Sequence, residues 1–142
     1  MKIGVDRDIL RAFLRPVGGE RVRKALAELR QLGVILCVLP VIADEIETDG
    51  DDVERRWRDA SFMEIPADEF LKGCATGIAK RYLDYHPDPR DCRVVAEAEC
   101  AKMAALVTLN PNLISGLASR AENIRIEKPW RTVARLKRQA EK

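Results

Sequence analysis

Residues 34–39 read Val-Ile-Leu-Cys-Val-Leu, so every position of this segment is apolar. An apolar run of this length without alternation is typical of a strand that is buried on both faces of a parallel sheet. Pro40 follows directly and suits the first turn of a helix. Both faces of such a strand need cover from other elements, so the segment indicates a layered domain in which helices pack on a sheet.

Other parts of the chain extend this pattern. Shorter apolar runs predict further strands at residues 2–5, 104–108 and 124–126. Apolar residues spaced three and four apart predict helices at residues 9–14, 22–32, 67–83 and 90–102 and one that begins at Pro40. Because strands alternate with helices, the sequence predicts an α/β fold with a mostly parallel sheet and helices on both of its faces.

The length of 142 residues predicts one domain, which we place at residues 1–130, followed by a basic C-terminal helix or tail at residues 131–142. The longest apolar run, residues 33–43, is about half of what a bilayer span needs, and the chain reaches Asp6 before a signal-peptide core could form. Its 4 cysteines form no C-x-x-C pair. We therefore expect a cytoplasmic protein in a reducing compartment, with no membrane association.

The net charge of +2 hides an uneven distribution. Residues 41–70 carry eleven acidic and three basic side chains, whereas both ends of the chain are basic. This pattern is compatible with a polyanion that binds basic edges around a carboxylate site, although charged faces in contact with solvent give the same pattern. His86 is the only histidine, so any metal must be held by oxygen atoms. His86 lies in a proline-rich loop, which predicts that its side chain is at the surface.

Three acids stand where a ligand site of an open α/β sheet is expected. Asp6 ends the first strand, Glu45 follows the second strand by about one helical turn, and Asp91 shares a helix face with apolar residues. Each has an ordinary alternative as a helix cap or a helical carboxylate. Glu97, in contrast, pairs with Arg93 at i, i+4 and is expected to face solvent. Together, the three acids suit Mg²⁺ or Mn²⁺ and chemistry at phosphate.

Four segments stand out along the chain: residues 5–10, 39–46, 88–98 and 106–111. In their order and spacing these segments resemble the four blocks of PIN-domain ribonucleases. The resemblance implies a PIN-like three-layer fold with four or five strands and a metal-dependent endoribonuclease, often the toxin of a VapBC-type toxin–antitoxin pair. It also implies that Asp6, Glu45 and Asp91 form the acidic metal site, with RNA as substrate and an antitoxin as partner. A homodimer is one possible assembly.

Two blocks depart from the family pattern. Arg7 and Asp8 take the places of Thr or Ser and Asn in the first block, and Asn110 stands where the fourth block often has an acid. These departures leave open a catalytically impaired PIN-fold protein that binds RNA or a partner. A nucleotide-binding domain of flavodoxin-like topology is a third reading, which the lack of a phosphate-binding loop in the sequence disfavours.

Residues near the first block supply further candidates. Arg7, Arg11 and Arg15 lie at i, i+4 and i+8 and form one helical stripe that can bind RNA phosphates or simply face solvent. Asp8 either caps the helix or reaches the metal site in place of the missing fourth acid. Asn110 precedes Pro111 and is expected to cap a helix, and it is also a candidate metal ligand.

Overall fold

The computed structural model of the protein describes residues 1–141. Within this range, five strands form one parallel sheet in the order β3-β2-β1-β4-β5. The strands are β1 (Lys2–Val5), β2 (Ile35–Val38), β3 (Met63–Glu64), β4 (Ala105–Val107) and β5 (Arg125–Glu127). The helices are α1 (Arg7–Leu14), α2 (Glu20–Gln31), α3 (Pro40–Asp49), α4 (Asp52–Arg55), the 3-10 helix η1 (Arg56–Asp59), α5 (Glu69–Tyr82), α6 (Pro89–Cys100), α7 (Pro111–Leu117) and α8 (Pro129–Ala140).

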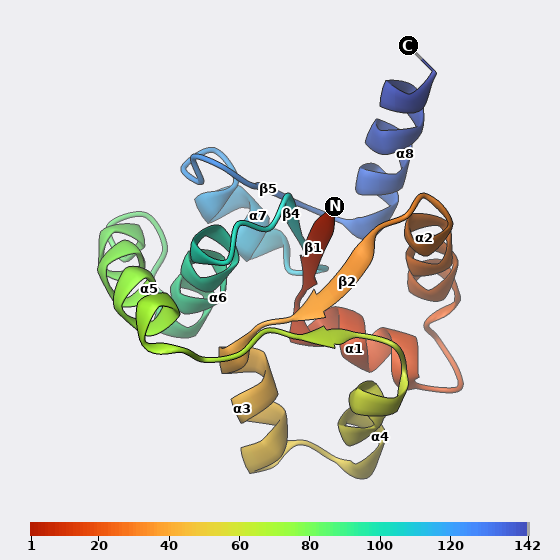
Figure 1. Ribbon diagram of the computed structural model, residues 1–142, viewed down its shortest axis with the longest axis horizontal. Helices are drawn as coiled ribbons and strands as arrows, with labels where there is room; N and C mark the ends of the chain where they lie inside the picture. Colours follow the sequence, from red (N-terminus) through yellow and green to blue (C-terminus); the bar gives the residue numbers. More distant parts are fainter. Residues whose placement is uncertain (142) are drawn as a thin grey trace.

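Helices cover the sheet on both sides, which makes three layers. Figure 1 shows α5 and α6 grouped on one side of the central strands and α1, α2 and α8 on the other. The predicted α/β fold with a parallel sheet and helices on both faces is thereby confirmed, with five strands. Residues 63–64 form a strand that the sequence analysis did not predict, because both residues are exposed and the strand has only two residues.

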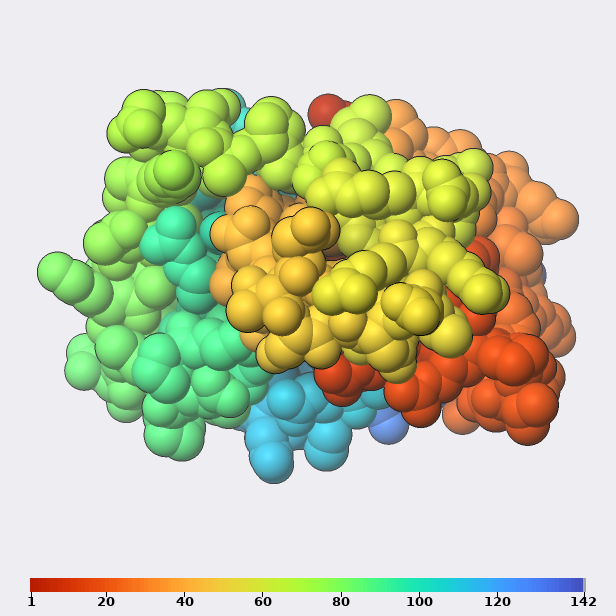
Figure 2. All heavy atoms as spheres, turned by 90° about the horizontal axis from the view of Figure 1, so that it is seen from below, coloured from red at the N-terminus to blue at the C-terminus, as the bar shows by residue number. Residues whose placement is uncertain are grey.

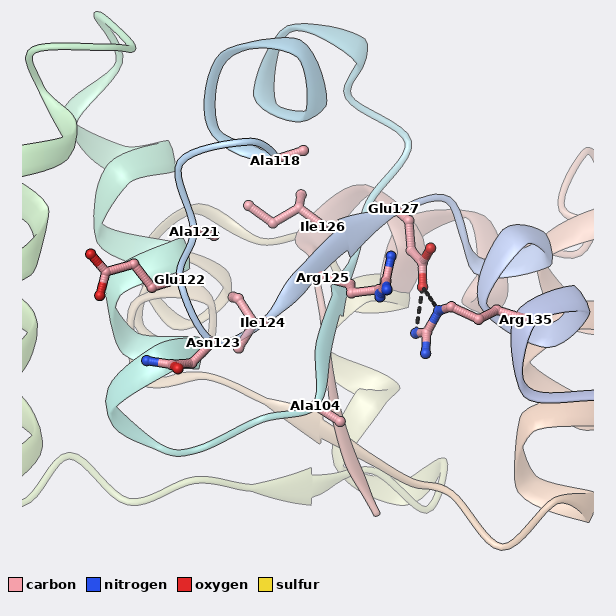
Figure 3. Close-up of a pocket in the computed structure, with 10 residues that line it drawn as sticks. All are labelled: Ala104, Ala118, Ala121, Glu122, Asn123, Ile124, Arg125, Ile126, Glu127 and Arg135. Carbon is pink, nitrogen blue, oxygen red and sulfur yellow. Dashed lines mark hydrogen bonds and ion pairs between the residues drawn. The ribbon is translucent and has the colours of Figure 1, made fainter. Parts of the chain in front are cut away.

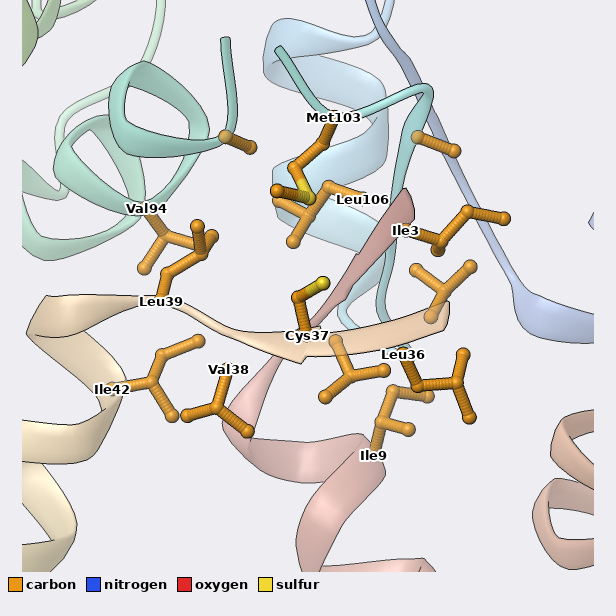
Figure 4. Packing of buried hydrophobic residues seen from close by; sticks show 14 of the residues in the cluster. Ile3, Ile9, Leu36, Cys37, Val38, Leu39, Ile42, Val94, Met103 and Leu106 are labelled. Carbon is orange, nitrogen blue, oxygen red and sulfur yellow. The ribbon is translucent and has the colours of Figure 1, made fainter. Parts of the chain in front are cut away.

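The core forms around β2, as the apolar run predicts. In Figure 4, Cys37 points toward Val94 and Met103 on the α6 side of the sheet, whereas Leu36 and Val38 point to the opposite side. All three β2 side chains are at most 1% exposed. Both faces of this strand are therefore buried, and the absence of alternation in its sequence follows from that position.

Capping residues and prolines set most helix starts. Side chains of Asp6, Asp51, Asp68, Asp88 and Asn110 accept backbone N–H groups at the starts of α1, α4, α5, α6 and α7. Prolines stand in the first turn of α3, α6, α7 and α8. These residues satisfy or remove N–H groups that a helix start leaves without partners, so the helices begin close to the predicted positions.

The basic end of the chain is a helix that packs on the domain. Helix α8 contacts α2, its residues Val133 and Leu136 are buried, and Lys137 pairs with Glu28 at 2.8 Å. Helix α8 starts at Pro129 and so includes most of the residues predicted as a basic helix or tail. In the part of the chain that the structure describes, no helix has the length and apolar character that a membrane crossing requires.

Helices α5 and α6 form a hairpin that a disulfide joins. Cys74, in the second turn of α5, pairs with Cys100, the last residue of α6. Cys37 and Cys92 are free and buried. The bridge differs from what the expectation of a reducing compartment implies, and spacing could not reveal it, because it depends on how α5 folds back along α6.

Candidate active site

The three acids singled out in the sequence meet at the carboxyl edge of the sheet. Asp6 directly follows β1, Glu45 lies in the second turn of α3, and Asp91 lies in the first turn of α6. Figure 2 views the molecule from this edge, where the segments of α1, α3, α6 and α7 adjoin. A hollow of about 270 Å³ lies among Asp6, Arg7, Asp8, Arg11, Glu45, Arg90 and Asn110.

One guanidinium group, that of Arg90, contacts all three acids. It forms two bonds to Glu45 through Nε, at 3.1 and 3.0 Å, and a third from Nη2 to Oε1 at 2.9 Å. Nη2 also lies 2.9 Å from Asp6 Oδ1, and Nη1 lies 3.2 Å from Asp91 Oδ1. Burial alone would lower the pKa of Arg90, but the hydrogen bond to Glu45 and the charge of Asp6 raise it overall. Arg90 is therefore a firmly charged centre of the cluster.

Asp6 is fixed from two sides. One carboxylate oxygen accepts the backbone N–H of Arg7 at 2.8 Å, and the other accepts the hydroxyl of Thr108 at 2.8 Å. Asp6 is 2% exposed and Thr108 is fully buried. Thr108 stands just after β4, next to β1, so the sheet itself brings the hydroxyl to the acid. The sequence analysis did not identify Thr108.

Replacing Thr108 with Val keeps the branched shape and removes the hydroxyl that donates to Asp6. Hydrogen bonds to charged groups contribute more than neutral ones, so the free energy of unfolding should fall by about 2 kcal/mol. Urea unfolding measures the change, and Thr48→Val, at an exposed position of α3, is the control, expected within about 0.5 kcal/mol of the wild type. Equal unfolding free energies for the two variants would contradict this role for the hydroxyl.

Asp91 is held by residues from two loops. Its Oδ2 lies 2.9 Å from His86 Nε2 and 3.5 Å from the amide nitrogen of Asn110. His86 is buried at 7% exposure, so the expected surface position is wrong. The loop lies close against α7, since a Cβ added at Gly116 would come within 2.8 Å of His86 Nδ1. His86 thus orients the carboxylate of Asp91.

Asp8 and Asn110 play different local parts. Asp6, not Asp8, is the N-cap of α1, and Asp8 Oδ2 accepts the backbone N–H of Leu109 at 3.1 Å. Across residues 1–141, Asp8 Oδ1 is a buried oxygen without a hydrogen-bond partner. Burial and the negative charge of Asp6 raise the pKa of Asp8 to about 6. Asn110 caps α7 as expected, which occupies its amide oxygen and leaves its amide nitrogen facing Asp91.

The arginine stripe lies against an acidic segment. Arg7 is buried and contacts Glu54 and Asp49, each at 2.7 Å. Arg11 also contacts Glu54, at 3.0 Å, but its side chain is 46% exposed. Arg15 is 55% exposed and lies 3.9 Å from an oxygen of Asp51. The stripe therefore runs from a buried guanidinium beside the site to exposed ones farther away.

Glu97 was expected to face solvent, and this expectation is wrong. The pair with Arg93 exists, with Nε 3.3 Å from Oε2, but Glu97 is only 3% exposed. Its other oxygen accepts the backbone N–H of Val41 at 2.9 Å, in the first turn of α3. Burial raises the pKa of Glu97. Helix α3 has no side-chain cap of its own, so this carboxylate from α6 takes that place.

The donor chemistry of the site fits a hard divalent ion, but its present arrangement holds a guanidinium. The carboxylates of Asp6, Glu45 and Asp91, with the partnerless oxygen of Asp8, are the oxygen ligands that Mg²⁺ and Mn²⁺ prefer. Among the residues described, no three His, Cys, Asp or Glu side chains are grouped as they would be around an ion. In the described arrangement the three acids contact the guanidinium of Arg90 instead.

A larger hollow lies elsewhere, along the edge strand β5. It measures about 660 Å³ and is lined by residues of β5, of the segment that precedes it and of α8. Figure 3 shows Glu127 and Arg135 in this hollow, joined by an ion pair of 2.7 Å. None of the three acids lines it. Because the three converging acids lie around Arg90 and not in this larger hollow, we place the candidate chemistry at the smaller one.

Solved structures share this fold. One chain in the crystal structure of VapBC2 from Rickettsia felis, bound to a DNA fragment from their promoter, matches with a TM-score of 0.68 at 12% identity, over 90% of this chain and 98% of that one. A chain of FitAcB from Neisseria gonorrhoeae matches with a TM-score of 0.57 at 17% identity, over the same shares of 90% and 98%. No family model and no curated protein matches the sequence. The fold is PIN-like, as the resemblance implied.

Proposed function

We propose that this chain is a metal-dependent endoribonuclease that hydrolyses RNA phosphodiester bonds, and that it acts in the cytoplasm as the toxin of a toxin–antitoxin pair. One observation carries the proposal: three carboxylates from three separate elements converge on a single cation, the guanidinium of Arg90. Such convergence gathers like charges and is unfavourable unless a cation is held there. It is therefore the arrangement expected of a site that binds cations.

Asp6, Glu45 and Asp91 would hold Mg²⁺ or Mn²⁺, with Asp8 beside them. When bound, such an ion activates water for attack on phosphorus and neutralises charge on the leaving oxygen. The chain's own residues prepare the site: Thr108 fixes Asp6, and His86 fixes Asp91. Asn110 adds an amide donor beside Asp91 rather than a charge. Such supporting contacts keep ligands in place.

Arg11 and Arg15 are the stripe residues suited to RNA, because their side chains are about half exposed while Arg7 is buried. Replacing both with Ala should weaken RNA binding for any sequence and reduce the slope of log affinity against log salt by about one unit per lost contact. Fluorescence anisotropy with labelled single-stranded RNA at several salt concentrations measures the slope. Lys72→Ala, at an exposed position of α5, is the control. An unchanged slope in the double variant would show that the stripe faces solvent and does not bind RNA.

The similarity to chains of VapBC2 and FitAcB supports the proposals that this chain is a toxin and that an antitoxin is its partner. A second function has its own support, because Arg90 already neutralises the acids that a metal would need. Under that reading the protein is a catalytically impaired PIN-fold protein that binds RNA or a partner. A titration with Mn²⁺ and labelled RNA separates the two. The ribonuclease cleaves as Mn²⁺ rises and stops with a chelator, whereas the binding protein shifts RNA on a gel without cleaving it.

A further inference from the structure

All three nitrogen atoms of the Arg90 guanidinium contact carboxylate oxygens of the site. Its partners are Asp6 Oδ1, both oxygens of Glu45, and Asp91 Oδ1. The remaining oxygens of Asp6 and Asp91 are already engaged by Thr108 and His86. Apart from Asp8 Oδ1, which has no partner, the oxygens that a divalent ion would use in this hollow are therefore the ones that Arg90 occupies.

The side chain of Arg90 is placed so that it can leave. It stands in the first turn of α6, and its backbone N–H is held by the carboxylate of Asp88 at 2.9 Å. Its side chain is 27% exposed, whereas those of Asp6 and Asp91 are 3% and 6% exposed. The side chain can thus swing toward solvent while the helix start and the two buried acids stay in place.

We propose that Arg90 is an internal counter-ion that holds the three acids together in the metal-free chain and is displaced when a divalent ion binds. This inference rests on the proposed function, since it assumes a metal at the same acids. Arginine suits the role because its planar fork contacts several carboxylates at once. Arg90 therefore competes with the divalent ion for the same three carboxylates. This competition helps to set the metal concentration at which the site is half filled.

The test is Mn²⁺ binding to the intact protein. Calorimetry and the electron paramagnetic resonance signal of free Mn²⁺ both measure this binding. Arg90→Gln removes the competing charge and should bind Mn²⁺ about tenfold or more tightly than the wild type, because no guanidinium then has to be displaced from the three acids. Arg11→Gln removes a charge from the wall of the same hollow but contacts Glu54 instead of the three acids. It should therefore give a clearly smaller gain.

Loss of Arg90 also leaves the three acids without a counter-charge, so Arg90→Gln should unfold at a lower temperature than the wild type in a chelator and gain more from Mn²⁺. Arg90→Lys keeps a positive charge and covers the case in which Arg90→Gln does not fold. Because an ammonium contacts fewer of the oxygens at once, its Mn²⁺ affinity should lie between those of the wild type and Arg90→Gln.

Different outcomes separate the two proposals. Equal Mn²⁺ affinity in the wild type and in folded Arg90 variants overturns the role of Arg90 and leaves the ribonuclease proposal intact. If none of these proteins binds Mn²⁺ at millimolar concentration, the metal site itself is wrong and both proposals fail. Tighter binding by Arg90→Gln than by Arg11→Gln supports displacement.

Discussion

Replacing Glu45 with Gln should lower the rate of RNA cleavage by about a hundredfold or more. Loss of a group that only supports a metal ligand already costs about ten- to a hundredfold, and Glu45 is proposed as a ligand itself. Gln retains the size and an oxygen acceptor but removes the charge that holds a cation. Cleavage of labelled single-stranded RNA at a fixed, saturating Mn²⁺ concentration measures the effect.

Glu47→Gln is the matched control, since it makes the same change one half-turn farther along α3 at an exposed position. Its cleavage rate should equal that of the wild type. The Glu45 side chain is 25% exposed, so its replacement should leave the fold intact, which circular dichroism checks. Full activity in Glu45→Gln would remove Glu45 from the site, whereas equal losses in both variants would point to a general effect of charge on α3.

The second large effect is on stability and concerns Glu54. This carboxylate is 5% exposed and contacts the guanidinium of Arg7 at 2.7 Å and that of Arg11 at 3.0 Å. It also completes the capping box of α4 with Asp51. Glu54→Gln leaves the guanidinium of Arg7 buried with a weaker partner, so we expect the free energy of unfolding to fall by about 3 kcal/mol at neutral pH.

Urea unfolding of Glu54→Gln tests this, with Asp52→Asn as the control. Asp52 lies in the same short helix, but its side chain is 98% exposed and its pair with Arg55 spans 3.8 Å. Such a pair contributes little, so the control should remain within about 0.5 kcal/mol of the wild type. If both variants unfold alike, the Arg7–Glu54 pair does not stabilise the domain.

Lowering the pH should remove the stabilisation that the Arg7–Glu54 pair gives the wild-type protein. The hydrogen bond from Arg7 lowers the pKa of Glu54 from 4.5 to about 2 in the folded chain. The unfolded chain then binds the proton first, so the stabilisation is present above pH 4.5 and is lost as pH falls from there toward 2. Glu54→Gln lacks this titration, and its loss of stability across that interval should be smaller.

Much of the fold could be predicted because local signals agree with the packing. Strand β2 is apolar throughout because it is buried on both faces, and Gly33, at φ 85°, ends α2 where the helical pattern stops. Strand β3 escaped prediction because its residues, Met63 and Glu64, are exposed and take their conformation from pairing with β2. Its pairing partner, not its sequence, makes it a strand.

The candidate site was predicted only in part. Asp6, Glu45 and Asp91 follow strands or begin helices, so chain position alone places them at one edge. Arg90 precedes Asp91 directly in the chain, yet its role also depends on contacts to Asp6 and Glu45, which lie in other elements. Thr108 carried a weak signal, since it is a polar residue at the end of a buried strand beside β1. No pattern along the chain encodes such cross-element contacts.

The hydrogen bond that the backbone N–H of Val41 donates to Glu97 limits how this domain can be re-engineered. It ties the start of α3 to the middle of α6, so Glu45 and Asp91 are carried by two helices that are joined by a buried polar contact. Grafting α3 alone into another PIN-like chain would leave that helix start without its acceptor. Exchanging α3 and α6 together would keep this bond in a chimera.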